Sequence, residues 1–120
     1  MIESYRDLDV WKLGVELAVA CYEVTRALPA EERYGLTSQI RRSAASVPAN
    51  IAEGYGRDTP GDYVRSLRIA QGSLKELETH VIIADRVGGI TPDRAEEVLR
   101  QTDRIGRMLR GLIRSIQAAT

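Results

Sequence analysis

Two long stretches of the sequence place apolar residues alternately three and four positions apart, without a break. The first row consists of Tyr63, Leu67, Ala70, Leu74, Leu77, Val81 and Ala84. The second consists of Ala95, Val98, Thr102, Ile105, Leu109, Leu112 and Ile116. This spacing lines up one side of an α-helix and forms a seam for a neighbouring helix. The two stretches therefore predict long helices that pack against other helices.

Caps and helix breakers divide the chain into four such helices. Thr59 and Thr91 each precede a proline, and an N-cap threonine followed by proline is typical of a helix start. The three- and four-residue spacing also occurs before Pro29 and again after Gly35. The predicted helices span residues of about 8–28, 36–55, 60–87 and 92–118. Short connections between four helices predict an all-α fold, a single antiparallel up-down-up-down four-helix bundle over residues 1–120.

The second predicted helix has a proline in its interior. Such a proline removes a backbone hydrogen bond and kinks or breaks a helix, at about 3 kcal/mol. The apolar row nevertheless keeps its phase on both sides of Pro48. We therefore predict one kinked helix rather than two separate helices.

Several polar side chains lie among the small and apolar residues of this helix. They are Arg41, Arg42, Asn50, Glu53 and Arg57. One hypothesis is a site that binds a ligand or catalyses a reaction, and the other is a structural polar cluster that fixes the kink and the packing. We favour the structural hypothesis, because the sequence offers no nucleophile or acid–base pair to complete a catalytic site.

Composition limits the chemistry further. The chain is 43% hydrophobic and 28% charged, which is typical of a globular protein, and its formal net charge is zero. Cys21 is the single cysteine, so an internal disulfide is excluded, and its place in an apolar row predicts a core residue. The single histidine, His80, has no second His and no Cys at zinc-binding spacing, and only Glu76 lies one turn before it. We expect no cofactor, no metal and no enzymatic activity.

The sequence also lacks an apolar run long enough for a signal peptide or a membrane span. We therefore expect a cytoplasmic protein without a membrane partner.

Charge is distributed unevenly along the chain. Residues 1–40 carry a net charge of −3, whereas residues 100–120 carry +4. Four arginines stand two positions after seam residues and therefore face away from the core: Arg100, Arg104, Arg107 and Arg114. Such a stripe can contact the phosphates of RNA or DNA, or it can be a solvated face that pairs with acidic residues.

Some apolar residues lie outside the core rows. They are Leu13 and Val19 in the first helix and Ile69, Ile82 and Ile83 in the third. Several such residues on neighbouring helices indicate a second contact surface, and self-association explains it most simply. We therefore expect a homo-oligomer that uses these residues as its subunit interface.

Three segments carry a resemblance to a known family: YRDLDVW at residues 5–11, EERYGLTSQIRRSAASVPANIAEGYGR at 31–57 and GSLKELET at 72–79. They resemble the bacterial four helix bundle proteins, also called 23S rRNA-intervening-sequence proteins, some of which are encoded within insertions in rRNA genes. The resemblance implies a four-helix bundle assembled as a ring-like homopentamer. Its signature positions here are Arg41, Arg42, Pro48, Asn50, Glu53, Gly54, Tyr55 and Arg57, none of which has a known catalytic role.

That family is in turn similar to the accessory protein of diversity-generating retroelements, a basic pentameric barrel that binds reverse transcriptase and nucleic acid. The present chain departs from it, because its isoelectric point is about 6.6. The leading hypothesis is therefore a non-enzymatic oligomeric scaffold or adaptor that contacts a protein or nucleic-acid partner. The alternative is an RNA- or DNA-binding accessory protein, associated with a retroelement or an rRNA insertion, that uses the arginine stripe. A third hypothesis, an enzyme built on Arg42, Asn50 and Glu53, has the least support.

Overall fold

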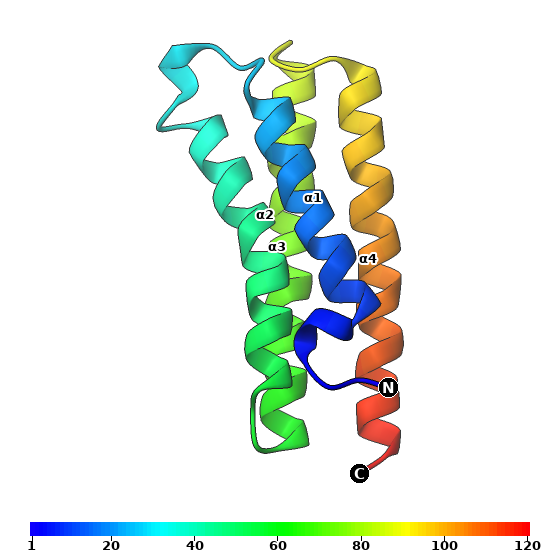
Figure 1. The fold of residues 1–120 in the computed structure, drawn as a ribbon. Coiled ribbons are helices and arrows are strands. Elements are labelled where there is room, and N and C mark those ends of the chain that lie inside the picture. Colours follow the sequence, from blue (N-terminus) through cyan, green and yellow to red (C-terminus); the bar gives the residue numbers. More distant parts are fainter.

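Four α-helices make up most of the chain in a computed structural model that describes residues 1–120 (Figure 1). They are α1 (Asp9–Thr25), α2 (Leu36–Tyr55), α3 (Pro60–Arg86) and α4 (Pro92–Ala118). Short 3-10 helices at Tyr5–Asp7 and Ala30–Glu32 precede α1 and α2. The chain contains no strand, which confirms the predicted all-α fold.

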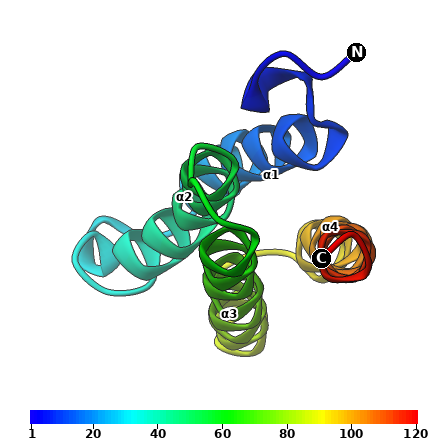
Figure 2. The same cartoon turned by 90° about the horizontal axis from the view of Figure 1, so that it is seen from below.

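The helices form an elongated bundle with dimensions of 47 × 22 × 22 Å. Consecutive helices run in opposite directions, so that α1 and α3 rise where α2 and α4 descend in Figure 1. Each helix packs against two neighbours, in the cycle α1, α2, α3, α4 and back to α1. Figure 2 shows this arrangement from the end of the bundle. The outer faces of all four helices are thereby left for solvent or for other molecules.

Caps fix the starts of the two longest helices as the sequence predicts. The Thr59 hydroxyl accepts a hydrogen bond from the Asp62 amide at 3.1 Å, and the Thr91 hydroxyl accepts one from the Arg94 amide at 3.3 Å. The end of α1 differs from the prediction, because the helix stops at Thr25 rather than at residue 28. The residues that follow make tighter backbone hydrogen bonds, each to the third residue before it. Such a tightened last turn is common at helix ends.

The single helix predicted across Pro48 is present, since α2 continues from Leu36 to Tyr55. Pro48 is buried, and Gly14 of α1 lies directly against it. A Cβ atom on Gly14 would lie only 3.3 Å from the Pro48 Cβ, a closer approach than most side chains allow. A glycine at this position therefore lets α1 and α2 come together at the proline.

The core consists largely of the predicted rows, with one-residue shifts at the start of α3, where Val64 is buried in place of Tyr63, and near the end of α4. Ile105 and Leu109 are buried as expected, but the next fully buried residue is Ile113, whereas Leu112 is only partly buried. A strict seven-residue repeat drifts by about 20° per heptad on a straight helix. The inward position has therefore moved by one residue at the end of the row.

None of the helices combines the length and the hydrophobicity that crossing a bilayer requires.

Candidate functional site

The polar residues of α2 do not form the single cluster that the sequence suggested. Arg41 reaches α1, where its Nε donates a hydrogen bond to the Thr25 hydroxyl at 2.8 Å. Its guanidinium carbon lies 4.6 Å from the centroid of the Tyr22 ring, which adds a cation–π contact. Arg41 therefore joins α2 to the end of α1.

Asn50 belongs to a second and separate group. Its Nδ2 donates to the Ser46 carbonyl at 2.8 Å and to the Ser46 hydroxyl at 3.0 Å. The Ser46 hydroxyl in turn lies 2.8 Å from the hydroxyl of Ser73 on α3. This chain of hydrogen bonds joins α2 to α3, on a different side of the helix from Arg41.

The remaining polar residues of α2 are on the surface. Glu53 and Arg57 form an ion pair one turn apart, with about half of each side chain exposed. Arg42 is exposed and makes no hydrogen bond or ion pair within the chain. The prediction of one cluster of five residues is thus wrong in its geometry, because four of the residues lie on different faces of α2 and Arg57 follows the end of that helix. Arg41 contacts α1 directly, Asn50 supports the Ser46 hydroxyl that contacts α3, and the other three are available at the surface.

The groove between α1 and α2 is mostly apolar, with a volume of about 370 Å³. It is lined by Val15, Ala18, Val19, Tyr22, Glu23, Arg26, Ala45 and Pro48. Val19, one of the predicted interface residues, is 53% exposed here. Leu13 lies elsewhere, partly buried in a small crevice between α1 and α4. The two residues therefore lie on different surfaces, whereas the sequence had suggested that they share one.

The outer face of α3 carries the other exposed apolar residues. Ile69 is 50% exposed and Ile83 is 42% exposed. They are fourteen positions apart, which places them on the same side of the helix but about four turns from each other, with the exposed Glu76 between them. Val87, the residue after the helix end, is exposed on that side as well. Ile82 is also exposed, but its helical position turns it by about 100° from Ile83. We call Ile69, Ile83 and Val87 the α3 apolar face.

The four predicted arginines of α4 are all exposed, but two of them are already paired. Arg100 contacts Glu96 at 3.2 Å, and Arg107 contacts Asp103 at 2.7 Å, both within α4. Arg104 and Arg114 make no ion pair. Exposed pairs such as these contribute at most about 1 kcal/mol and can rearrange around a ligand. The stripe is therefore positive at Arg104 and Arg114 and locally balanced elsewhere.

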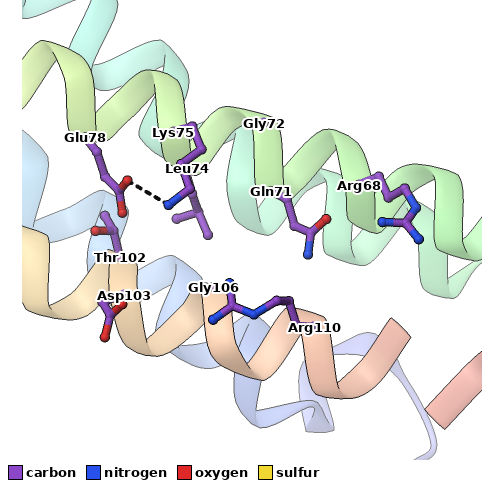
Figure 3. A pocket seen from close by; sticks show the side chains of 10 residues that line it. All are labelled: Arg68, Gln71, Gly72, Leu74, Lys75, Glu78, Thr102, Asp103, Gly106 and Arg110. Carbon is purple, nitrogen blue, oxygen red and sulfur yellow. Dashed lines mark hydrogen bonds and ion pairs between the residues drawn. The ribbon is translucent and has the colours of Figure 1, made fainter. Parts of the chain in front are cut away.

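A groove between α3 and α4 was not predicted from the sequence (Figure 3). Its volume is about 360 Å³, and Leu74 is the one hydrophobic residue in its lining. The lining residues are Arg68, Gln71, Gly72, Leu74, Lys75, Glu78, Thr102, Asp103, Gly106 and Arg110. The interior glycines of α3 and α4 were the one signal of a hollow between these helices. We call this hollow the α3–α4 groove.

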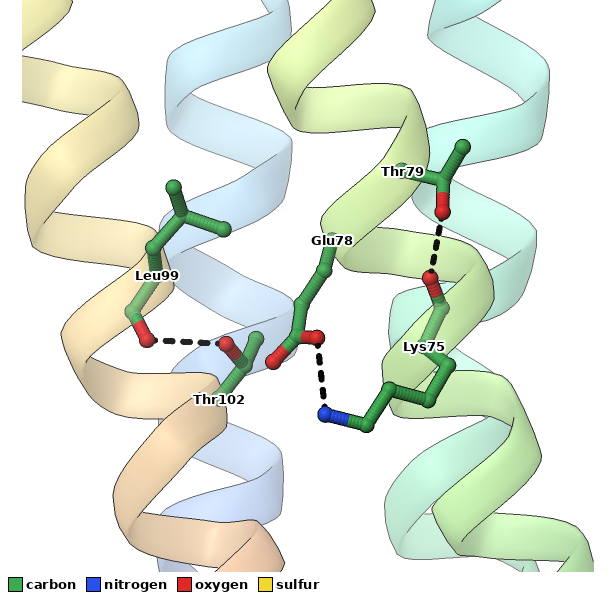
Figure 4. A network of polar contacts seen from close by, with 5 residues as sticks. All are labelled: Lys75, Glu78, Thr79, Leu99 and Thr102. Carbon is green, nitrogen blue, oxygen red and sulfur yellow. Dashed lines mark hydrogen bonds and ion pairs between the residues drawn. The ribbon is translucent and has the colours of Figure 1, made fainter.

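Hydrogen bonds organise one end of the α3–α4 groove (Figure 4). Lys75 donates to the Glu78 carboxylate at 3.1 Å, and the buried Thr102 donates to the Leu99 carbonyl at 2.9 Å. The Thr79 hydroxyl donates to the Lys75 carbonyl at 2.8 Å. The carboxylate of Glu78 is therefore compensated by a lysine of its own helix.

Two further kinds of site can be checked in the structure, a reactive cysteine and a group of metal ligands. Burial raises the pKa of the Cys21 thiol to about 12, so this cysteine is protonated at neutral pH. Nowhere do three or more His, Cys, Asp or Glu side chains come together as potential metal ligands.

Comparison with known proteins identifies the family. A crystal structure from Bacteroides thetaiotaomicron, of a protein of unknown function from the S23 ribosomal protein family, has a similar fold with a TM-score of 0.81. It is 27% identical in sequence, and the match covers 87% of this chain and 97% of that one. No curated protein matches the sequence. The model of the 23S rRNA-intervening sequence proteins matches residues 6–111, which is most of the chain. The chain therefore belongs to the 23S rRNA-intervening sequence protein family.

Proposed function

We propose that the protein is a non-enzymatic helical scaffold that self-associates and offers its remaining surfaces to a partner. The supporting observation is a pair of unlike apolar surfaces on one chain. One is the α1–α2 groove, where Val19 is half exposed, and the other is the α3 apolar face. Exposed apolar groups on a small bundle favour burial in an interface.

The two surfaces differ in shape as well as in position. The α1–α2 groove is concave and has small residues, Ala18 and Ala45, in its lining. The α3 apolar face consists of isoleucine and valine side chains that project from the outside of one helix. A contact between unlike surfaces is heterologous, and it closes into a ring when the rotation between subunits allows. This geometry is compatible with the ring-like homopentamer that the family resemblance implies.

The positions of the polar residues support a scaffold rather than an enzyme. Arg41 is held in a contact with α1, Asn50 is bonded to Ser46 of its own helix, and Cys21 is buried with a raised pKa. Glu53 is paired with Arg57 at the surface and lines none of the larger grooves. These residues therefore do not meet around a common site where a substrate could react.

A mixing experiment tests the heterologous contact. Val19→Asp places a charge in the α1–α2 groove, and Ile83→Asp places one on the α3 apolar face. We expect each variant alone to be monomeric by light scattering, because burying an unpaired carboxylate is costly. An equimolar mixture should form a heterodimer, since each variant retains the surface that the other lacks. Variants that stay oligomeric alone, or a mixture that stays monomeric, would contradict the proposal.

A second candidate is contact with RNA or DNA through α4, associated with a retroelement or an rRNA insertion. The observation in its favour is that Arg104 and Arg114 are exposed without ion pairs. Binding should weaken as salt rises, because each neutralised phosphate releases counterions. Replacing Arg104 and Arg107 by Glu should abolish it, and binding that is unchanged by these replacements would exclude the α4 stripe.

A further inference from the structure

We propose that the α3–α4 groove binds a phosphate group, held mainly by Arg68, Gln71 and Arg110. The proposal is independent of self-association, because it concerns polar residues on another side of the bundle. It begins with the shape of the groove. Gly106 has no side chain where α4 faces α3, and a Cβ there would lie 3.8 Å from the Leu74 Cδ1. The missing side chain leaves Leu74 as the floor of an open polar hollow.

The arginine of α4 uses this space. One guanidinium nitrogen of Arg110 lies 3.9 Å from the position that a Gly106 Cβ would occupy. Figure 3 shows Arg110 extended along the groove beside Gly106, while Arg68 and Gln71 point from α3 toward α4. Donors from two helices thus face one space. A groove for an apolar partner would be lined as the α1–α2 groove is, mainly by hydrophobic residues.

Charge within the groove favours an anion. Its two carboxylates are already paired, Glu78 with Lys75 at 3.1 Å and Asp103 with Arg107 at 2.7 Å. Arg68 and Arg110 make no hydrogen bond or ion pair within the chain. The groove therefore holds two positive charges that no carboxylate of the chain pairs.

The donor set fits phosphate better than carboxylate. Two guanidinium groups and one carboxamide offer many N–H donors and a charge of +2. A carboxylate has one charge and two oxygens, and a single arginine satisfies it in a bidentate pair. A phosphate monoester or pyrophosphate has more charge and at least one further oxygen, so it can contact arginines of both helices at once, and on a nucleic-acid backbone two neighbouring phosphodiesters supply the same charge. The group can belong to a small phosphorylated molecule or to a nucleic-acid backbone, since the groove is open to solvent.

Titration with defined probes tests the proposal. Pyrophosphate, acetate and a single-stranded oligothymidylate are added separately to the full-length protein, and binding is followed by calorimetry and by NMR of the arginine Nε–H groups. The groove variant is Arg68→Gln with Arg110→Gln. The matched control is Arg86→Gln with Arg94→Gln, which removes the same charge from exposed positions outside both the groove and the α4 arginine stripe.

We expect at least one phosphate probe to bind and to shift the Nε–H signals of Arg68 and Arg110. The groove variant should bind it about tenfold or more weakly, because charge-assisted hydrogen bonds are lost. The control should weaken binding by less than about threefold, through screened long-range charge alone. Binding of pyrophosphate alone would identify a small phosphorylated ligand. Binding of the oligonucleotide alone would identify a nucleic-acid backbone.

A third variant tests whether binding requires the open space of the groove as well as its positive charge. Gly106→Leu leaves the net charge unchanged and fills the groove, so it should reduce binding as strongly as the loss of both arginines. Circular dichroism checks that each variant keeps its helices. The proposal is overturned if no phosphate probe binds, if acetate binds as well as pyrophosphate, or if the control variant loses as much affinity as the groove variant.

Discussion

Interior glycines show how single residues set the spacing between these helices. Gly54 of α2 lies against α3, where an added Cβ would be 2.9 Å from the Ser66 Cβ and 3.0 Å from Cδ1 of Tyr63. Gly72 of α3, by contrast, has no other residue within 4 Å of that position. The same residue type is therefore needed for close packing at one site and is merely tolerated at the other.

Alanine substitutions should separate these two roles. Gly54→Ala should destabilise the protein by about 1–3 kcal/mol, because the backbone or Ser66 must move. Gly72→Ala should stabilise it by about 0.5–1 kcal/mol, since alanine has the higher helix propensity. Urea denaturation measures both free energies of unfolding. Equal effects of the two substitutions would show that helix propensity, rather than contact with α3, governs Gly54.

Burial of Cys21 predicts a dependence of stability on alkaline pH. The pKa of its thiol is raised from 9.0 to about 12 in the folded chain. The unfolded chain therefore loses this proton first, and the stabilisation that is present below pH 9 declines as the pH rises toward 12. Denaturation curves for the wild type and Cys21→Ala should show a steeper decline for the wild type just above pH 9. Parallel declines would contradict the assignment. Tyr63, whose pKa is also raised by burial, affects both proteins equally.

Contacts at the helix scale depend on a few polar side chains. Arg41 joins α2 to α1 through the Thr25 hydroxyl and the Tyr22 ring. Arg42, its neighbour in sequence, makes no such contact. Since both residues have the same helix propensity and charge, they form a matched pair for testing what the interhelical contact contributes.

Replacement of Arg41 by Leu should cost about 1–2 kcal/mol, because a hydrogen bond and a cation–π contact are lost together. Arg42→Leu should change the free energy of unfolding by less than about 0.5 kcal/mol in the monomeric Val19→Asp background, as expected at an exposed position. Thermal or urea unfolding in that background measures both. An equal cost for the two replacements would mean that charge, not the contact with α1, explains the effect.

Much of the fold could be predicted from the sequence, because the apolar row of a helix consists of residues that are close together in the chain. The rows of α3 and α4, the threonine caps and the continuity of α2 through Pro48 all depend on residues close together in the chain. The shift from Leu112 to Ile113 at the end of α4 could not be predicted in this way, since it depends on the actual twist of the helix.

The sites were harder to predict, because they depend on which residues of different helices face one another. Spacing along α2 placed Arg41, Asn50 and Glu53 near each other, yet Arg41 contacts α1, Asn50 bonds to Ser46 of its own helix, and Glu53 pairs with Arg57 at the surface. The α3–α4 groove depends on the register of two antiparallel helices, which brings Gly106 opposite Leu74. That register cannot be predicted from the residue pattern of one helix alone.

At the scale of the whole molecule, we propose that one chain carries two unlike apolar surfaces that bind each other in successive copies. Light scattering coupled to size-exclusion chromatography, at micromolar protein concentration, tests it most directly. We predict a closed assembly whose mass does not change on dilution, five times the 13.3 kDa of one chain for the homopentamer. A monomeric mass at that concentration, with the helices intact, would contradict it.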